Sequence, residues 1–231
     1  MRLALPIEWL PASGAAEQLI LLLHGGASNG AATAPLAQAL RAEFPHAALL
    51  APDAPLPVPD GPGLRQWFDS AGINDDNRAE RVGAALPALL DWVRETQQRL
   101  CVGPAATALA GFSQGAMLAL AAALAHDGLA GRVLSFSGRF VATPLQAPRQ
   151  TTVHLFHGGA DPTIEAGHSR SALELLASLH GDATLDIAEG VGHTLHPALI
   201  QRALFRLRNH IPARTWAAAL GAIPAGLQLP P

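Results

Sequence analysis

The stretch "ALAGFSQGAMLALAAALA", residues 108–125, places Ser113 between two glycines, with a short apolar run before it and a long alanine-rich run after it. This order predicts a buried strand, a tight turn and a buried helix. A serine nucleophile needs that context, because the turn strains its backbone and crowds the flanking positions until little beyond glycine fits. The start of the helix beneath it also favours developing negative charge. The alternative is a tight glycine turn with an idle serine.

The glycine spacing alone is suggestive rather than decisive. With nine serines and 22 glycines in 231 residues, chance supplies roughly 0.1 such patterns. The position of the pattern between a strand and a helix carries more weight. The hypothesis of a nucleophile therefore depends on finding its partners elsewhere in the chain.

Outward from this stretch, short apolar runs alternate with longer segments that suit helices, which predicts an α/β fold with a mostly parallel central sheet flanked by helices. We expect a single domain over residues 1–231, with a core of about 19–211 and a C-terminal tail of 212–231 in which one short helix would fit. The expected strands are 19–23, 47–51, 105–110, 132–136, 152–156 and 184–187. The expected helices are 31–42, 78–100, 114–126, 164–179 and 197–209.

One long stretch, Pro52 to Asn77, is rich in proline and glycine and is expected to be irregular. Loops of this length in compact domains are usually functional or disordered, and the pair Trp67-Phe68 argues against disorder. We expect one of these aromatic side chains to wall a substrate pocket, the alternative being that both fill the core. No other segment is long enough for a large helical lid.

Composition excludes several kinds of chemistry. The chain has no lysine and no tyrosine. Without lysine there is no Schiff base, no pyridoxal-phosphate enzyme, no phosphate loop ending in GK[ST] and no serine hydrolase with a lysine base. The single Cys101 allows no internal disulfide and no cysteine-rich zinc site, which fits a reducing compartment.

Charge and hydropathy point away from nucleic acid and membranes. The net charge is −3, with no block of like charges. The N-terminus lacks the long uncharged core of a signal peptide, and the longest apolar run, Ala116 to Ala125, is half of the ~20 residues that span a bilayer. We therefore expect a cytoplasmic protein with no nucleic-acid partner and no stable membrane insertion, as a monomer or homodimer.

A serine needs a base and an orienting acid, and two later strands supply candidates. The strand in "TTVHLFHGGADP" is followed by Asp161, and the strand in "ATLDIAEGVGHT" is followed by His193. Open parallel sheets place their sites at the carboxyl ends of strands. The sequence therefore predicts Asp161 as the acid and His193 as the base of Ser113.

Each candidate has rivals. His196 is the other candidate base, although it directly precedes Pro197 at an expected helix start. Glu165 and Asp186 compete as the acid, the first expected in the first turn of a helix and the second within a strand. The chain has 10 histidines, and His24 and His157, each before a glycine at a strand end, are expected to pin loops through hydrogen bonds.

Acyl transfer also needs hydrogen-bond donors for the oxyanion. The backbone N–H of Gln114, directly after the serine, is one candidate, and "LLHGGASNG" after the first expected strand supplies the other, with Gly26 the preferred donor. This glycine-rich stretch has neither phosphate-binding pattern, G-x-G-x-x-G or GK[ST]. A metal site at His193-x-x-His196 lacks a third ligand at a suitable spacing, so we expect no metal and no cofactor.

Four segments together resemble the phospholipase/carboxylesterase family, the small serine esterases that include acyl-protein thioesterases. They are "LLHGGASN", "GFSQGAMLAL", "HGGADPTI" and "GHTLHP", in the family's order, and "RQWFDSAGINDDNRAERV" between the first two is most similar to the small bacterial carboxylesterases. The resemblance runs from about Leu19 to Ile211. It implies an alpha/beta-hydrolase fold with a minimal lid, no cofactor, and hydrolysis of carboxylic esters or thioesters.

The resemblance implies the same roles as those expected above. These are Ser113 as nucleophile, Asp161 as acid, His193 as base, and the backbone N–H groups of Gly26 and Gln114 as oxyanion donors. The sequence departs from the family pattern at the first loop. That loop usually reads H-G-x-G-D, and here it carries Ala27 and Ser28 at the last two positions. That departure bears on loop details and substrate preference.

The expected function is a serine carboxylesterase that hydrolyses small-molecule esters with short to medium acyl groups. One alternative is an acyl-protein thioesterase or lysophospholipase acting on longer acyl chains. The alternative from another class is a non-catalytic binding protein with a hydrolase fold, although such proteins commonly lose a member of the triad and all three candidates are present here.

Overall fold

The computed structural model describes residues 6–59 and 61–221. Seven strands form one sheet: β1 (Ile7–Trp9), β2 (Gln18–Leu23), β3 (Ala47–Ala51), β6 (Thr107–Phe112), β7 (Arg132–Phe136), β8 (Thr152–Gly158) and β9 (Ala183–Ala188). Their order across the sheet is β1-β3-β2-β6-β7-β8-β9. Strand β1 runs antiparallel to β3, and the other neighbours are parallel.

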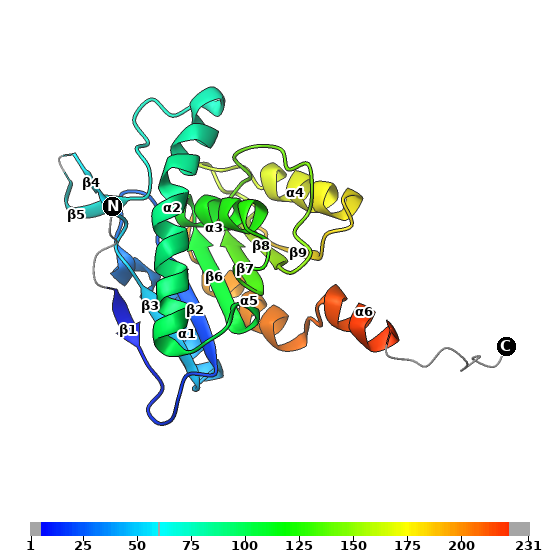
Figure 1. The fold of residues 1–231 in the computed structure, drawn as a ribbon. Coiled ribbons are helices and arrows are strands. Elements are labelled where there is room, and N and C mark those ends of the chain that lie inside the picture. Colours follow the sequence, from blue (N-terminus) through cyan, green and yellow to red (C-terminus); the bar gives the residue numbers. More distant parts are fainter. Residues whose placement is uncertain (1–5, 60, 222–231) are drawn as a thin grey trace.

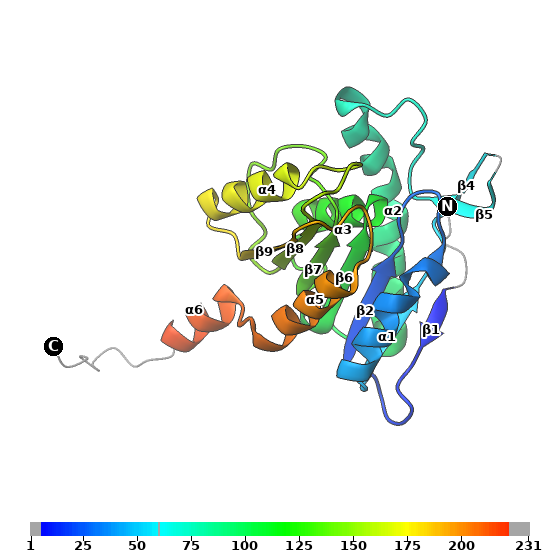
Figure 2. The same cartoon turned by 180° about the vertical axis from the view of Figure 1, so that it is seen from behind.

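Helices cover both faces of this sheet. The helices are α1 (Ala34–Glu43), α2 (Asp75–Leu100), α3 (Gln114–Ala125), α4 (Gly167–Ser178), α5 (Pro197–Asn209) and α6 (Ala213–Gly221), with short 3-10 helices at Gly30–Thr33 and Pro104–Ala106. Of these, α6 extends away from the sheet (Figure 1). Helices α2, α3 and α4 lie on the face toward the viewer in Figure 1, and α1 and α5 lie on the opposite face, seen in Figure 2.

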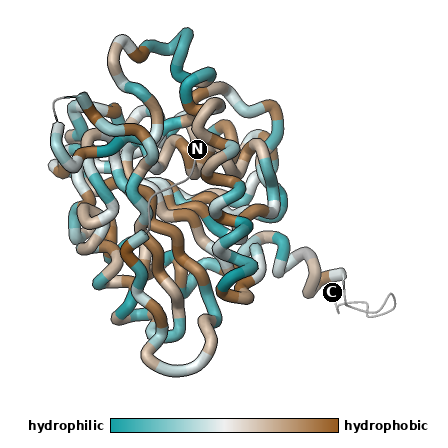
Figure 3. Tube along the Cα trace, turned by 60° about the vertical axis from the view of Figure 1, so that its left-hand side comes forward, coloured by the Kyte–Doolittle hydropathy of each residue, from teal (hydrophilic) through white to brown (hydrophobic). Residues whose placement is uncertain are grey.

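The central strands are apolar along their whole length because both of their faces are covered. In β2, Leu19, Leu21 and Leu23 belong to the hydrophobic core under α2 and α3, whereas Ile20 and Leu22 belong to the core under α1 and α5. Figure 3 shows this as hydrophobic colour concentrated along the strands. Because β6 to β9 are parallel, the carboxyl ends of β6, β8 and β9 lie at the same edge of the sheet, with β7 between β6 and β8.

The expected parallel sheet is confirmed, with each expected strand and helix present within about three residues of its expected bounds. The expectation that the whole of Pro52–Asn77 is irregular is wrong. That stretch contains a two-stranded ribbon, β4 (Leu56–Val58) paired antiparallel with β5 (Gly61–Gln66). Prolines and glycines are tolerated there because a two-stranded ribbon has only edge strands, where some backbone N–H groups need no partner. Strand β1 was also not predicted.

The C-terminal segment is attached at the amino ends of the strands. Arg214 at the start of α6 donates hydrogen bonds to the hydroxyl of Thr152 (3.0 Å) and to the carbonyl of Gly131 (3.2 Å). The expected short helix in the tail corresponds to α6, and residues 222–231 lie outside the described part. Within the described ranges, no helix is long and apolar enough to cross a membrane.

Candidate active site

Ser113 occupies a strained turn between β6 and α3. Its φ of 52° lies in the left-handed region, where a residue with a side chain is uncommon. A Cβ on Gly111 would come within 2.3 Å of the carbonyl oxygen of Gly115, and a Cβ on Gly115 within 2.2 Å of that of Leu23. Both glycines of "GFSQG" are therefore required by close backbone approach, as expected for a nucleophile elbow.

The Ser113 side chain points at His193, which follows β9. The His193 Nε2 lies 3.0 Å from the Ser113 Oγ, and the His193 Nδ1 lies 2.7 Å from the Asp161 Oδ2. Because the Asp161 carboxylate accepts a hydrogen bond from the Nδ1–H group, the His193 Nε2 carries no proton and can accept the one on the serine hydroxyl. The structure thus brings together the three predicted side chains in the order of a charge-stabilised triad.

Asp161 is held ionised at the end of β8. Burial of this carboxylate raises its pKa, but hydrogen bonds from the backbone N–H of Ile164, from His193 and from the backbone N–H of Thr163 outweigh that effect and leave the pKa below its ordinary value. Both backbone donors reach Oδ1 at 2.9 Å. The second oxygen stays available to orient the imidazole.

The loops that carry Asp161 and His193 are packed against each other. The backbone N–H of Ala160 donates to the carbonyl of Val191 at 2.9 Å, and a Cβ on Gly158 would meet that same carbonyl oxygen at 2.3 Å. The Phe112 ring lies 4.8 Å from the His193 ring, centre to centre. These contacts fix the imidazole above the carboxyl end of β6, where Ser113 begins its turn.

The expected oxyanion loop, which follows β2, lies directly over the start of α3. A Cβ on Gly25 would be 3.5 Å from the Ser113 Cβ, and one on Gly26 would be 2.8 Å from the Gln114 side chain. Among the described residues, neither the Gly26 nor the Gln114 backbone N–H takes part in a hydrogen bond. Two unengaged donors next to the Ser113 hydroxyl are what stabilisation of an oxyanion at this position would need.

The Gln114 side chain has a role that sequence reasoning missed. It accepts a hydrogen bond from the Trp67 backbone N–H (3.0 Å) and donates one to the Phe68 carbonyl (3.1 Å). Gln114 therefore ties the start of α3 to the segment after β5. The available signal was the glutamine itself, since a polar side chain beside a buried helix start must find partners.

Trp67 and Phe68 are buried, with 2 % and 3 % of their surfaces exposed. The Trp67 indole donates to the carbonyl of His24 at 2.8 Å, which supports the first residue of the oxyanion loop from below. Both rings belong to the hydrophobic core under α2 and α3. A contact of either ring with substrate stays a prediction.

A cavity of about 390 Å³ opens beside the triad. It is lined by the oxyanion loop, by Thr33 and Pro35, and by the segment His193–Leu195 together with Phe112. The His193 imidazole therefore lines this cavity.

The rival residues have other partners. His196 caps α5, where its Nδ1 accepts from the Ala198 backbone N–H at 3.2 Å. Asp186 is paired with Arg202 at 2.7 Å and Arg206 at 2.8 Å. Glu165 lies two residues before the start of α4 rather than in its first turn, and it is no part of the triad.

His24 and His157 pin loops, as expected. His24 donates from Nδ1 to the Gly25 carbonyl (2.6 Å) and accepts at Nε2 from the Ala54 backbone N–H (2.9 Å). His157 bonds the Ser169 hydroxyl and the Ile164 carbonyl, both at 2.7 Å. Burial is the main cause that lowers the pKa of each ring. In the described part of the chain, no group of three or more His, Cys, Asp or Glu side chains could hold a metal ion.

Comparison with known proteins agrees with this geometry. The pattern of the Phospholipase/Carboxylesterase family matches residues 10–211. The chain is 42 % identical over 205 residues to Esterase YpfH of Escherichia coli (strain K12), covering 89 % of this chain and 88 % of that protein. It is 26 % identical over 223 residues to an Acyl-protein thioesterase 1 of Gibberella zeae, covering 88 % and 95 % of the two chains.

Solved structures show the same architecture. The crystal structure of esterase PE8 superposes with a TM-score of 0.83 at 34 % identity, covering 91 % of this chain and 100 % of that one. A Bacillus cereus carboxylesterase superposes with a TM-score of 0.73 at 18 % identity, covering 87 % and 91 % of the two chains, which shows the likeness in fold. The chain therefore belongs to the phospholipase/carboxylesterase family and is a hydrolase with the alpha/beta-hydrolase fold.

Proposed function

We propose that this protein is a serine carboxylesterase in which Ser113 is the nucleophile, His193 the base and Asp161 the acid that orients the base. The observation that carries the proposal is the pair of contacts at His193, 3.0 Å to the Ser113 Oγ and 2.7 Å to the Asp161 Oδ2. A serine hydroxyl is a weak nucleophile without such a base. Membership of the family adds independent support.

The reaction follows from the positions of these groups. The Ser113 Oγ attacks the ester carbonyl while its proton moves to the His193 Nε2, and the backbone N–H groups of Gly26 and Gln114 stabilise the oxyanion. The imidazolium then gives the proton to the alcohol oxygen as the C–O bond breaks. Water, deprotonated by His193, attacks the acyl-serine and releases the acid.

Fluorophosphonate labelling followed by mass spectrometry tests the nucleophile. We expect one covalent adduct on Ser113, and no adduct in the Ser113→Ala variant. An adduct on Ser28 or Ser70 in its place would contradict the assignment. The base is tested by comparing His193→Ala, expected to be nearly inactive, with His196→Ala, expected to retain activity because that ring caps α5.

We further propose a preference for short to medium acyl esters. An open site with a minimal lid can cover only a few methylenes, each worth about 0.8 kcal/mol when fully buried. The second candidate is a thioesterase or lysophospholipase for longer chains, favoured by the likeness to the Gibberella zeae thioesterase. Hydrolysis rates of p-nitrophenyl esters from acetate to palmitate, with a matched thioester series, discriminate the two.

A further inference from the structure

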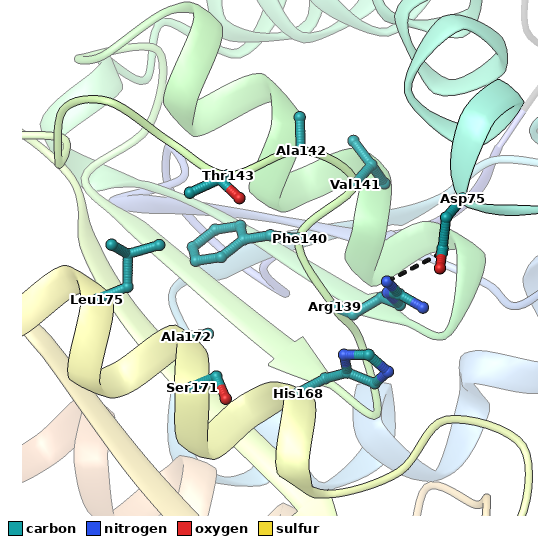
Figure 4. Close-up of a pocket in the computed structure, with 10 residues that line it drawn as sticks. All are labelled: Asp75, Arg139, Phe140, Val141, Ala142, Thr143, His168, Ser171, Ala172 and Leu175. Atoms are coloured by element: carbon teal, nitrogen blue, oxygen red, sulfur yellow. Dashed lines mark hydrogen bonds and ion pairs between the residues drawn. The ribbon is translucent and has the colours of Figure 1, made fainter.

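A second cavity lies at the same edge of the sheet as the triad. It has a volume of about 260 Å³ and is enclosed by the first turn of α2, by the segment 139–143 after β7, and by α4. Figure 4 shows Arg139, Asp75 and His168 at one end of it and the apolar side chains of Phe140 and Leu175 at the other. The cavity therefore combines a charged end with an apolar wall.

This second cavity is built from segments that touch the triad. The Ser113 backbone N–H donates to the Phe136 carbonyl at 3.0 Å, so β7 ends beside the elbow. Two residues on, a Cβ at Gly138 would lie 2.6 Å from the Ala116 Cβ in the first turn of α3. Helix α4, which carries His168, follows the loop of Asp161.

The two cavities share no lining residue. They lie on opposite faces of the sheet, because Phe140 and Ala172 belong to the hydrophobic core under α2 and α3, whereas Phe112 and Leu195 belong to the core under α1 and α5. The cavity of about 390 Å³ is lined by His193, which protonates the leaving alcohol in the proposed reaction. The acyl group of an ester bound to Ser113 must point away from that imidazole. The second cavity lies on the face of the sheet opposite to the one that His193 lines, so we assign it to the acyl group.

Positive charge at the second cavity is only partly compensated. Arg139 donates to an Asp75 oxygen at 3.2 Å, and Arg78 contacts the same oxygen, so one carboxylate serves two guanidinium groups. The Asp75 side chain is 79 % exposed, whereas that of Arg139 is 22 % exposed. Burial is the main cause that lowers the Arg139 pKa, and the charge of Arg78 lowers it further. The nearby Glu165 acts on His168 and does not line the cavity.

Unpartnered buried polar atoms gather at the end of β7 and directly after it. Within the described ranges, three buried side-chain atoms lack a hydrogen-bond partner: the Arg139 Nε and the hydroxyls of Ser135 and Ser137. Ser137 also has a strained φ of 47°. Buried donors are normally paired, and backbone strain concentrates at functional sites. The Arg139 guanidinium thus lines the cavity with one N–H group that has no partner in the protein.

We propose that the second cavity binds a carboxylate at the far end of the acyl group, so that the preferred substrates are monoesters of small dicarboxylic acids. The planar guanidinium of Arg139 suits a carboxylate, which it can bind through two parallel N–H groups. The wall formed by Phe140 and Leu175 covers the methylenes between the two carbonyl carbons. This inference rests on the proposed esterase function and assigns its substrate class.

Matched esters test the proposal. The probes are mono-p-nitrophenyl esters of succinic, glutaric and adipic acid, each compared with its neutral methyl diester analogue. We expect the wild-type protein to prefer the charged ester of at least one length. Arg139→Gln is expected to lower the charged-to-neutral ratio of kcat/KM about tenfold or more, because a hydrogen-bonded ion pair is lost. Asp75→Asn is expected to raise it by removing the competing carboxylate.

Arg170→Gln is the matched control, because Arg170 lies on α4 outside the cavity and contacts Glu189. It is expected to leave the ratio unchanged. A wild-type ratio at or below one for all three lengths, or a ratio that Arg139→Gln does not alter in a folded protein, would overturn the proposal. An equal loss in Arg170→Gln would overturn it too, since the effect would then be one of general surface charge.

A binding measurement tests this inference independently of the proposed esterase function. Calorimetric titration of the Ser113→Ala variant with glutarate alone, and with inorganic phosphate in a second arm, needs no turnover. We expect glutarate to bind and Arg139→Gln to abolish that binding. If no ester of either series were hydrolysed, the proposed esterase function would be contradicted. The titration would still show whether the second cavity binds a dicarboxylate. Tighter binding of phosphate than of glutarate would overturn the assignment to dicarboxylic acids.

Discussion

Two histidine–aspartate pairs lie at opposite ends of the parallel strands, and they do different things for the protein. At the carboxyl edge the His193 Nδ1 lies 2.7 Å from Asp161, and at the amino edge the His210 Nε2 lies 2.9 Å from Asp182. Asp182 also accepts from the Thr152 hydroxyl at 2.7 Å and from the Ala213 backbone N–H at 3.1 Å. The second pair therefore attaches the start of α6 to the sheet.

The two histidines differ in what surrounds the side of the ring that does not contact the aspartate. The His193 Nε2 meets a hydroxyl on a strained turn beside a cavity, whereas the His210 ring packs edge-on against His154 at 5.2 Å. An oriented imidazole has no chemistry to perform without a nucleophile and room for a substrate. The comparison predicts that matched changes at the two edges separate activity from stability.

Ser113→Ala should give the largest effect. Removing the nucleophile is expected to lower kcat by about 10⁴-fold or more, because base and acid then have no group to activate. The free energy of unfolding, measured with urea, should stay within about 0.5 kcal/mol of wild type, since the side chain is small and partly exposed. Ser70→Ala serves as the control, and a comparable loss there would contradict the assignment.

Asp161→Asn should lower kcat by about 10³- to 10⁴-fold in a folded protein, since an amide no longer holds the imidazole in the required tautomer. Steady-state kinetics with p-nitrophenyl butyrate, alongside circular dichroism, measure the loss. Retention of more than a tenth of the activity would show that another acid serves His193.

The matched change at the opposite edge is Asp182→Asn. Burial raises the Asp182 pKa, but hydrogen bonds from Thr152, Ala213 and His210 lower it below its ordinary value, so the carboxylate is ionised in the folded protein. Weakening these charge-assisted bonds should cost about 2–3 kcal/mol of unfolding free energy. The value of kcat should stay within about twofold, and a loss like that of Asp161→Asn would erase the distinction between the two edges.

The free energy of unfolding should depend on pH through His154, which lies near the amino end of β8. Burial, followed by the charges of Arg132 and His210, lowers the His154 pKa from 6.5 to about 3. Arg132 donates to the His154 Nε2 at 3.0 Å, which requires the neutral ring. Below the unfolded pKa of 6.5, the unfolded chain binds a proton here that the folded protein does not bind. The His154 contribution to stability therefore falls as pH falls from 6.5 toward 3.

Urea melts at pH 7 and pH 5 measure this effect. At about 1.4 kcal/mol per pH unit, His154 contributes roughly 2 kcal/mol to the loss of stability by pH 5. His154→Gln should remove that contribution from the pH dependence, whatever its stability at pH 7. Equal pH dependence in the variant and in the wild type would contradict a neutral buried His154.

Much of the triad could be predicted because its signals are local. Gly111, Ser113 and Gly115 follow one another within a turn, and Asp161 and His193 follow strands whose apolar runs are plain in the sequence. The sheet brings these ends together by its topology alone. The unpredicted features, by contrast, depend on contacts between distant segments.

Arg139 and Asp75 are an example, because they meet across 64 positions in the chain and neither stands in a recognisable pattern. The Gln114 side chain likewise reaches Trp67 across 47 positions. The β4–β5 ribbon escaped prediction for another reason, since its prolines and glycines are those of a loop. Amino-acid composition predicts strands poorly where backbone pairing between two short segments, rather than burial of apolar side chains, forms them.

Trp67 gives the smallest expected effect and separates two roles for one side chain. If the ring walls the acyl pocket, Trp67→Ala should lower kcat/KM more for long acyl esters than for acetate, because each covered methylene is worth about 0.8 kcal/mol. If the ring only supports the oxyanion loop through its bond to the His24 carbonyl, kcat should fall by a similar factor for every acyl length.

Trp67→Phe isolates the second role, since it keeps most of the buried ring and removes the indole N–H. The variant loses one hydrogen bond, the one from the indole to the His24 carbonyl that supports the oxyanion loop. We therefore expect kcat to fall about tenfold or less, by the same factor for every acyl length. Kinetics with p-nitrophenyl esters of two to sixteen carbons measure both variants. A wild-type rate that climbed steadily to sixteen carbons would overturn the preference for short and medium acyl groups and favour the thioesterase alternative.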